Sequence, residues 1–172
     1  LFIVPRKVII FPAKLLEYLE KNRINFIFWV PSVIITVANS GLLNRFRLAD
    51  LRKILFAGEV MPNTQLNIWR KALPDALYAN LYGPTEITVD CCFYKVDREF
   101  ADEEPLPIGR ACRNTEIFLI NDNNEVIEVQ DKIGELCVRG SSLSVGYYGN
   151  PEKTKEAFLQ NPLNPYYEEK IY

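Results

Sequence analysis

Short apolar runs and amphipathic segments alternate through the first half of the chain. The apolar runs are strand-like and cover residues 1–4, 25–30, 53–57 and 76–82. Between them, apolar residues recur three and four positions apart, the spacing of one helix face, in segments that begin at Pro12, Pro31 and Pro62. Proline is favoured at the first position of a helix because no intrahelical partner exists there for an amide hydrogen. This alternation predicts a mostly parallel sheet with covering helices.

The second half of the chain follows a different pattern. Segment 97–107 interrupts the alternation with five acidic residues and two prolines, which predicts a surface loop or a subdomain boundary. Strand-like runs with a period of two follow at 116–120, 126–129 and 135–139. Asn150 and Pro151 suit the N-cap and first position of a helix. We therefore expect an α/β fold: a partial α/β subdomain over residues 1–104, followed by a small antiparallel β unit in a partial β-rich subdomain over residues 105–172.

The composition favours a globular protein and excludes several kinds of site. The chain has 172 residues, of which 48% are hydrophobic, enough for a packed core. No apolar run approaches the roughly 20 residues that span a bilayer, so we expect no membrane partner. The four cysteines form no CxxC pair and there is no histidine, which argues against a zinc site. Cysteines scattered in apolar segments favour the reducing cytoplasm as the location of the protein. Without histidine, Ser-His and Cys-His catalysis within this chain are excluded.

Charge is distributed unevenly along the sequence. Residues 1–96 carry 12 Lys and Arg against 7 Asp and Glu, whereas residues 97–172 carry 8 against 15. The basic half suits an anionic ligand. Its basic residues are scattered in pairs and form no patch with interleaved aromatic residues, so nucleic-acid binding is not expected.

A polar turn follows directly on the apolar run 76–81. Residues 80–86 read Asn-Leu-Tyr-Gly-Pro-Thr-Glu. A strand that ends in a Gly-Pro turn would expose the Thr85 hydroxyl and the Glu86 carboxylate side by side at the carboxyl edge of the sheet, where ligands collect in α/β proteins. These oxygen donors suit a phosphate and its Mg²⁺. Taken singly, Gly83 is better explained as a turn residue, and Glu86 as a solvated carboxylate or a charge at a helix N-terminus.

A second strand end has related features. The run 53–56 leads into Ala57-Gly58-Glu59, whose small residues would let a flat ring lie against the backbone. This segment is also explained by a plain connection from strand to helix. If the two strands are neighbours, their loops would bracket an adenine and its phosphates.

Together these segments resemble the acyl-adenylate-forming superfamily, specifically the amino-acid adenylation domains of nonribosomal peptide synthetases and the D-alanine:D-alanyl carrier protein ligases. The resemblance is carried, in the family's order, by residues 55–59, 80–86, 107–110, 134–140 and 146–148. It covers nearly the whole chain. Residues 143–147 and 150–152 resemble the D-alanine ligases somewhat more than typical synthetase modules.

The resemblance implies that the chain is part of a ligase that makes an aminoacyl adenylate from ATP and an amino acid, with Mg²⁺, and passes it to a phosphopantetheinyl carrier protein. It implies catalytic roles for Thr85, which would meet the α-phosphate, and for Glu86, which would ligate Mg²⁺. The residues implied in nucleotide binding are Ala57, Gly58, Glu59, Asn80, Tyr82, Gly83 and Thr85. Residues 134–148 match a motif that we interpret as mainly structural.

The same resemblance implies a substrate pocket that is mostly apolar, which favours a neutral amino acid. Its lining would be Phe28, Leu55, Ala57, Leu81, Val89 and Asp90. The carboxylate of Asp90 is explained equally well by a polar substrate group and by exposure to solvent.

Other readings of the sequence remain open. The family's phosphate loop and the Asp that anchors a substrate amine are expected before Leu1, and its Thr-Gly-Asp motif and catalytic Lys after Tyr172. We therefore expect an internal piece of a longer protein that is inactive alone. A fatty or aryl acid ligase that transfers to coenzyme A is an alternative within the superfamily. A non-catalytic interaction domain that keeps the fold is an alternative outside enzyme function.

Overall fold

The computed structural model of the chain describes residues 1–129 and 132–172. Two compact units can be distinguished, and both are discontinuous in sequence. The first unit contains Leu1–Leu81 and Tyr94–Gly109, and the second contains Tyr82–Phe93 and Arg110–Tyr172. The subdomain boundary expected at residue 104 stays a prediction, since compactness of a unit does not define a functional subdomain.

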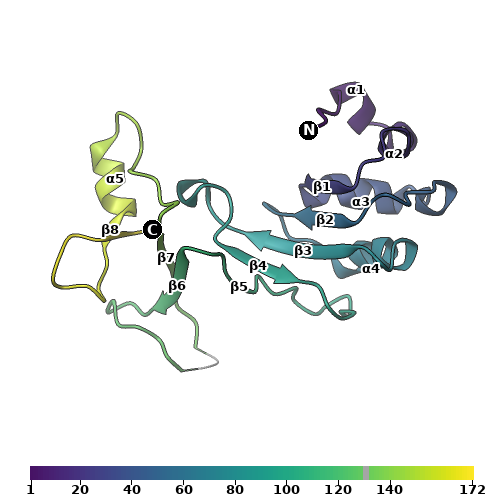
Figure 1. Ribbon diagram of the computed structural model, residues 1–172. Helices are drawn as coiled ribbons and strands as arrows, with labels where there is room; N and C mark the ends of the chain where they lie inside the picture. Colours follow the sequence, from purple (N-terminus) through teal and green to yellow (C-terminus); the bar gives the residue numbers. More distant parts are fainter. Residues whose placement is uncertain (130–131) are drawn as a thin grey trace. The chain divides into compact units, whose positions relative to one another are not determined.

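The first unit is built on parallel strands. Strands β1 (Phe26–Trp29), β2 (Lys53–Phe56) and β3 (Leu77–Tyr82) lie next to one another in that order, and both pairings are parallel. Beside β3 the amide of Val96 donates to the carbonyl of Tyr78 at 2.9 Å. Parallel neighbours need crossover connections, and here helices supply them (Figure 1).

Two of the four helices of the first unit begin at the residue that the sequence pattern predicts. The four helices are α1 (Arg6–Ile9), α2 (Pro12–Lys21), α3 (Pro31–Asn39) and α4 (Asn63–Ala72), with a 3₁₀ turn η1 (Leu43–Arg45) after α3. Pro12 and Pro31 occupy the first positions of α2 and α3 as expected. Pro62 instead precedes α4 as its N-cap residue.

One hydrophobic core fills the first unit. Buried side chains of β1, β2 and β3, such as Ile27, Ile54 and Tyr78, pack in one cluster with those of α2, α3 and α4. Trp69 of α4 is fully buried, and its indole nitrogen donates to the carbonyl of Ile34 in α3 at 2.9 Å. This bond satisfies the one polar atom of the largest core side chain.

The second unit is built from short antiparallel pairs. Its elements are η2 (Thr85–Ile87), β5 (Arg110–Ala111), β6 (Thr115–Ile120), β7 (Glu135–Gly140), α5 (Pro151–Ala157), β8 (Leu159–Gln160) and β9 (Lys170–Ile171). Antiparallel pairs join β6 to β7, β8 to β9, and β5 to the start of β4 (Cys92–Lys95). Asn150 caps α5 as expected, because its side chain accepts from the amide of Lys153. The prediction of a parallel sheet followed by a small antiparallel unit is confirmed.

Two expected strands are absent from the described residues. Residues 1–4 are irregular and lead into α1, so the strand predicted there is wrong. The strand predicted at 126–129 is reduced to a single bridge between Ile120 and Val126. Apolar residues alone do not make a strand, since each strand also needs a partner for its backbone hydrogen bonds. No helix in the described part of the chain is long and apolar enough to cross a membrane.

Candidate functional site

The residues expected at the nucleotide and substrate sites divide between the two units. The first unit holds Phe28, Leu55, Ala57, Gly58, Glu59, Asn80 and Leu81. The second unit holds Tyr82, Gly83, Thr85, Glu86, Val89 and Asp90. Leu81 and Tyr82 are consecutive residues of β3, so the motif at 80–86 starts in one unit and ends in the other.

In the first unit, the apolar residues expected in the substrate pocket share one face of the sheet. Phe28 of β1 pairs with Leu55 of β2, which pairs with Ala79 of β3, and Leu81 follows on the same side because strand side chains alternate. The residues of the opposite face are the buried ones that contact the helices. Phe28 is 43% exposed, so this face keeps apolar surface accessible within the unit.

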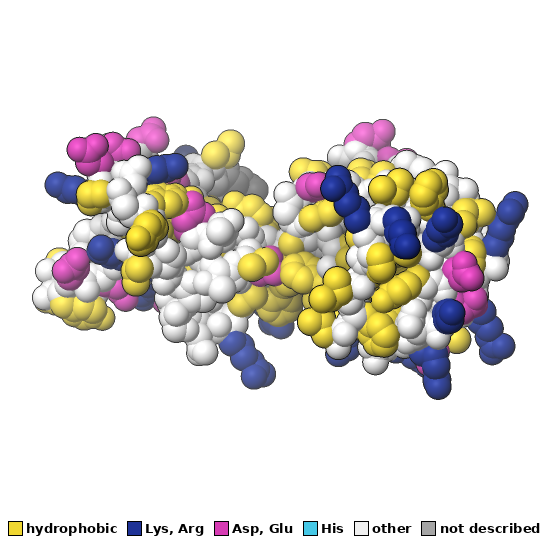
Figure 2. Space-filling view, turned by 90° about the horizontal axis from the view of Figure 1, so that it is seen from above, with side chains coloured by type: hydrophobic (Ala, Val, Ile, Leu, Met, Phe, Trp, Pro, Cys, Tyr) yellow, Lys and Arg dark blue, Asp and Glu magenta, His cyan; other side chains and the backbone are white. Residues whose placement is uncertain are grey.

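Basic side chains are also spread over this unit. On the face seen in Figure 2, Lys and Arg side chains of the first unit stand apart from one another among hydrophobic ones. This arrangement agrees with the scattered pairs in the sequence.

The end of β2 makes a tight connection to the next helix. Ala57 is buried, and Gly58 has a φ of +89°, a conformation that glycine adopts without steric cost. The carboxylate of Glu59 accepts from the amide of Ser32 at 2.8 Å and from the Ser32 hydroxyl at 3.2 Å. Since Ser32 lies in the first turn of α3, Glu59 satisfies a free amide and places negative charge at the helix N-terminus. Sequence reasoning missed this contact, which joins residues far apart in the chain.

The side chain of Asn80 has a defined partner. Asn80 is 9% exposed, and its amide nitrogen donates to the carbonyl of Pro107 at 2.9 Å. This bond connects two segments that carried the family resemblance, 80–86 and 107–110. The amide of Asn80 therefore holds the loop before Gly109 in place beside the end of β3.

In the second unit, the turn after β3 folds back on itself. The amide of Cys91 donates to the carbonyl of Tyr82 at 2.8 Å. A Cβ atom on Gly83 would lie 2.6 Å from the Val89 carbonyl oxygen and 2.7 Å from the Asp90 Cα atom. Glycine is required at this position because the backbone of residues 89–91 comes too close for a side chain. The interpretation of Gly83 as a turn residue did not predict this contact.

The turn itself contains a strained pair of residues. Thr88 and Val89 have φ values of +61° and +80°. Both are β-branched, and such side chains rarely enter the left-handed region. Strain of this kind persists only where surrounding contacts hold the backbone, and it is concentrated at functional sites. Residues 85–89 are therefore held in shape by the rest of the unit.

The two residues expected to be catalytic lie together in η2. Thr85 is exposed, and Glu86 is partly exposed. One carboxylate oxygen of Glu86 accepts from the Tyr147 hydroxyl at 2.5 Å. This hydrogen bond lowers the pKa of Glu86 below its ordinary value, with smaller contributions from Tyr172 and Lys153 and an opposing effect of burial. The carboxylate is therefore ionised and oriented near neutral pH.

The donor set of η2 fits a hard cation bound together with phosphates. Among the residues that the structure describes, no group of three or more His, Cys, Asp and Glu side chains could hold a metal ion. Mg²⁺ in nucleotide sites is commonly held by one or two carboxylates, with phosphate and water oxygens completing its shell. The Glu86 carboxylate and the Thr85 hydroxyl, from consecutive residues of η2, have the right chemistry for that mode.

The last two residues expected in the substrate pocket differ in exposure. Val89 is 54% exposed. Asp90 is partly buried, and its Oδ1 atom is buried without a hydrogen-bond partner in the described part of the chain. Burial raises the pKa of Asp90. A buried acceptor of this kind is available to a donor on a ligand.

Comparison with known proteins gives consistent matches along the chain. The family described as "AMP-binding enzyme" matches residues 1–148. Bacitracin synthase 3 of Bacillus licheniformis is 32% identical over 88% of this chain and 2% of its own length. Delta-poly-L-ornithine synthetase of Acinetobacter baumannii is 31% identical over 99% of this chain and 12% of its own length.

Solved structures have the same fold. The crystal structure of CmiS6 matches with a TM-score of 0.90 and 30% identity, over 98% of this chain and 41% of that one. The crystal structure of IdnL1 matches with a TM-score of 0.86 and 28% identity, over 98% of this chain and 35% of that one. The chain thus spans less than half the length of each of these relatives.

Proposed function

This chain belongs to the AMP-binding enzyme family, and from that premise we propose that it forms part of an enzyme that uses ATP to activate an amino acid as an aminoacyl adenylate. This family match agrees with the resemblance of the sequence motifs to acyl-adenylate-forming enzymes. The proposed acceptor of the activated amino acid is the phosphopantetheine thiol of a carrier protein. An amino acid substrate is supported by a relative whose name describes the synthesis of poly-L-ornithine.

The observation that carries the proposal is the Glu86 carboxylate, oriented by Tyr147, in the same short turn as the exposed residue Thr85. Attack of a substrate carboxylate on the α-phosphate of ATP forms the acyl phosphate bond and releases pyrophosphate. Negative charge develops on the nonbridging oxygens of that phosphate, and a bound Mg²⁺ would stabilise it. We propose that Glu86 holds the cation and that the Thr85 hydroxyl donates to the α-phosphate.

This chemistry does not need a histidine, which is absent from the chain. A substrate carboxylate is already ionised near neutral pH, so no histidine has to remove a proton from it. The chain's own contribution is then to position groups and to place charge. A rigid turn with one fixed carboxylate is suited to that role.

The nucleotide and substrate contacts of the two units complete the proposal. Gly58, Glu59, Asn80, Tyr82 and Gly83 are proposed to line the adenine site together with Ala57. The apolar face that carries Phe28, Leu55 and Leu81 is proposed to receive a neutral amino acid side chain. Val89 and Asp90 are proposed as further contacts of the substrate. The charge of Asp90 would select a substrate with a polar group.

Pyrophosphate exchange in the full-length protein that contains this chain tests the proposal. We expect exchange that depends on one or a few amino acids and on Mg²⁺, and we expect Glu86→Gln to reduce it about 100-fold, as for loss of one electrostatic group in an active site. Glu168→Gln is the matched control, since Glu168 is an exposed glutamate of the same unit.

Two outcomes would change the assignment. Unaltered exchange in Glu86→Gln would remove Glu86 from the site. Exchange that responds only to carboxylic acids without an amine would replace the amino acid by an acyl or aryl acid.

A further inference from the structure

The turn that contains Glu86 is covered by a segment more than fifty residues away in sequence. The amide of Ser144 donates to the Glu86 carbonyl at 2.7 Å, and the Thr88 hydroxyl donates to the Ser142 carbonyl at 2.7 Å. Ile87, between them, is fully buried in a cluster that includes Val138 of β7. The backbone of the turn is therefore fixed by residues 138–144 of the same unit.

The side chain of Glu86 is fixed by the continuation of that segment. The Tyr147 hydroxyl donates to Oε1 of Glu86 at 2.5 Å, a length typical of a hydrogen bond from a hydroxyl to an ionised acceptor. A free glutamate side chain rotates about three bonds, and this contact selects one of its arrangements. A carboxylate has about four acceptor positions, so one bond to Oε1 leaves capacity for a cation.

Tyr147 is itself held by α5. Its amide donates to the Thr154 hydroxyl at 2.9 Å, and its ring lies edge-on to Phe158 at 5.6 Å. The ammonium group of Lys153 lies over the same ring at 4.8 Å. Helix α5 therefore fixes both the backbone and the ring of Tyr147.

The residue before Tyr147 explains how the chain reaches this position. Gly146 has a φ of +134°, and a Cβ atom there would lie 2.3 Å from the methyl group of Thr154. Only glycine allows α5 to approach so closely. The sequence Gly146-Tyr147 thus places a tyrosine hydroxyl at a fixed point next to η2.

We propose that Tyr147 is a positioning residue that fixes the Glu86 carboxylate in the arrangement that receives a divalent cation with ATP. This inference rests on the proposed function of Glu86. It assigns to Tyr147 a role in the site, whereas from the sequence residues 134–148 were interpreted as mainly structural. A tyrosine hydroxyl bonded to the Glu86 carboxylate would then control how well the cation is held.

The test is Tyr147→Phe in the full-length protein, because phenylalanine keeps the ring contact with Phe158 and removes only the hydroxyl. We expect the affinity for Mg²⁺-ATP, measured by calorimetry, to fall about tenfold, as for loss of a hydrogen bond to a charged group. Affinity for ATP in EDTA should not change. In exchange assays, the Mg²⁺ concentration for half-maximal rate should rise, while the KM for the amino acid stays constant.

Tyr148→Phe is the matched control, since Tyr148 is the next tyrosine in the chain and is fully exposed. It should leave both affinities unchanged. The double variant with Glu86→Gln and Tyr147→Phe should bind Mg²⁺-ATP no more weakly than Glu86→Gln alone, because Tyr147 acts through Glu86.

The outcomes separate this inference from the proposed function. If Glu86→Gln weakens Mg²⁺-ATP binding and Tyr147→Phe does not, the positioning role is wrong and the function of Glu86 stands. If Tyr147→Phe weakens ATP binding equally with and without Mg²⁺, its role is structural and the inference is again overturned. If Glu86→Gln itself has no effect on Mg²⁺ dependence, the proposed function fails first.

Discussion

In the first unit eighteen buried hydrophobic residues form one core, whereas the two clusters in the described part of the second unit contain only four and three buried residues. The first unit has a layered structure in which one face of a parallel sheet contacts helices. Burial of apolar surface is the main source of stability in such an arrangement.

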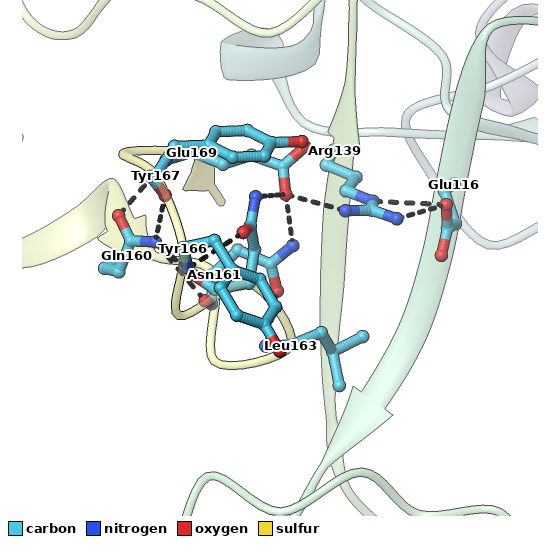
Figure 3. A network of polar contacts seen from close by, with 9 residues as sticks. Glu116, Arg139, Gln160, Asn161, Leu163, Tyr166, Tyr167 and Glu169 are labelled. Carbon is cyan, nitrogen blue, oxygen red and sulfur yellow. Dashed lines mark hydrogen bonds and ion pairs between the residues drawn. The ribbon is translucent and has the colours of Figure 1, made fainter.

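The second unit depends more on polar side chains. Glu169 accepts from Arg139 and from Asn161, each at 2.6 Å, and from Asn164 at 3.2 Å (Figure 3). Arg139 also bonds to Glu116 of β6 at 2.8 Å. This network fixes the loop between β8 and β9 against β7.

The difference bears on the proposed site. Glu86 and Tyr147 lie in the unit with the smaller clusters, and their geometry is set by hydrogen bonds. Hydrogen bonds are directional, so they fix the orientation of a carboxylate better than apolar contacts do. The apolar face proposed for the substrate side chain lies in the other unit. Substitutions in the two units should accordingly act in different ways and to different extents.

The largest effect is expected from Trp69→Ala in the first unit. The substitution leaves a large cavity and removes the hydrogen bond from the indole to the Ile34 carbonyl, which together should cost about 3–5 kcal/mol in the free energy of unfolding. Urea denaturation followed by far-UV circular dichroism measures it. Ile68→Ala, at a 37% exposed position of the same helix, should cost far less. Equal costs for the two variants would contradict the assignment of the core.

A smaller effect is expected from Asn161→Ala in the second unit. Asn161 is 1% exposed, donates to Glu169 and accepts from the amide of Leu163 at 2.9 Å. Loss of these hydrogen bonds at a buried position should lower the free energy of unfolding by about 1–3 kcal/mol. Hydrogen exchange measurements should show faster exchange of the Leu163 amide. The unfolding transition followed by tryptophan fluorescence should not change, because both tryptophans, Trp29 and Trp69, lie in the first unit.

The exposed Asn123 supplies the control for that experiment. Asn123→Ala should change stability by less than about 0.5 kcal/mol. If Asn161→Ala were equally mild, the polar network would not stabilise the second unit.

Acidification should weaken the same network by a smaller amount. Hydrogen bonds from Asn161, then from Asn164, together with the Arg139 charge, lower the pKa of Glu169. The folded state thus favours the ionised form, and its stabilisation is complete above the unfolded pKa of about 4.3 and is lost as the pH falls through the lower folded pKa. Glu169→Gln should flatten the pH dependence of exchange protection around β9 between pH 6 and 3. An identical pH profile in the variant would rule out Glu169 as its source.

The sequence predicted most of the first unit because its signals are local. Strand-like runs, helix periodicity and the prolines at 12 and 31 each act within a few residues. Residues 1–4 and 126–129 were mistaken for strands because an apolar run does not reveal whether a neighbouring strand is present. The motif at 80–86 was recognised as a unit, and β3 does end within it.

The contacts that shape the proposed site could not be read in the same way. The reason for Gly83 is the return of the chain at residues 89–91, and the partner of Glu86 is a tyrosine 61 positions later. The bond from Glu59 to α3 and the bond from Asn80 to Pro107 each span 27 positions. Such pairs depend on the folded path of the backbone, which periodicity does not encode.

The smallest expected effect on stability is that of substituting Asp90, and it is a gain, whereas the other substitutions should lower stability. Burial raises the pKa of Asp90, so the folded state disfavours the ionised form, and stability is lost as the pH rises from the unfolded pKa of about 3.9 through the folded pKa. Asp90→Asn removes the charge and should increase the free energy of unfolding at pH 7 by less than about 1 kcal/mol, because the group is only partly buried. Below pH 3 the variant and the original chain should unfold alike in urea. A variant that is less stable at pH 7 would mean that the carboxylate is stabilised by the folded unit. The expected gain would instead identify Asp90 as a charge kept at a cost in stability, which agrees with a role in binding a substrate group.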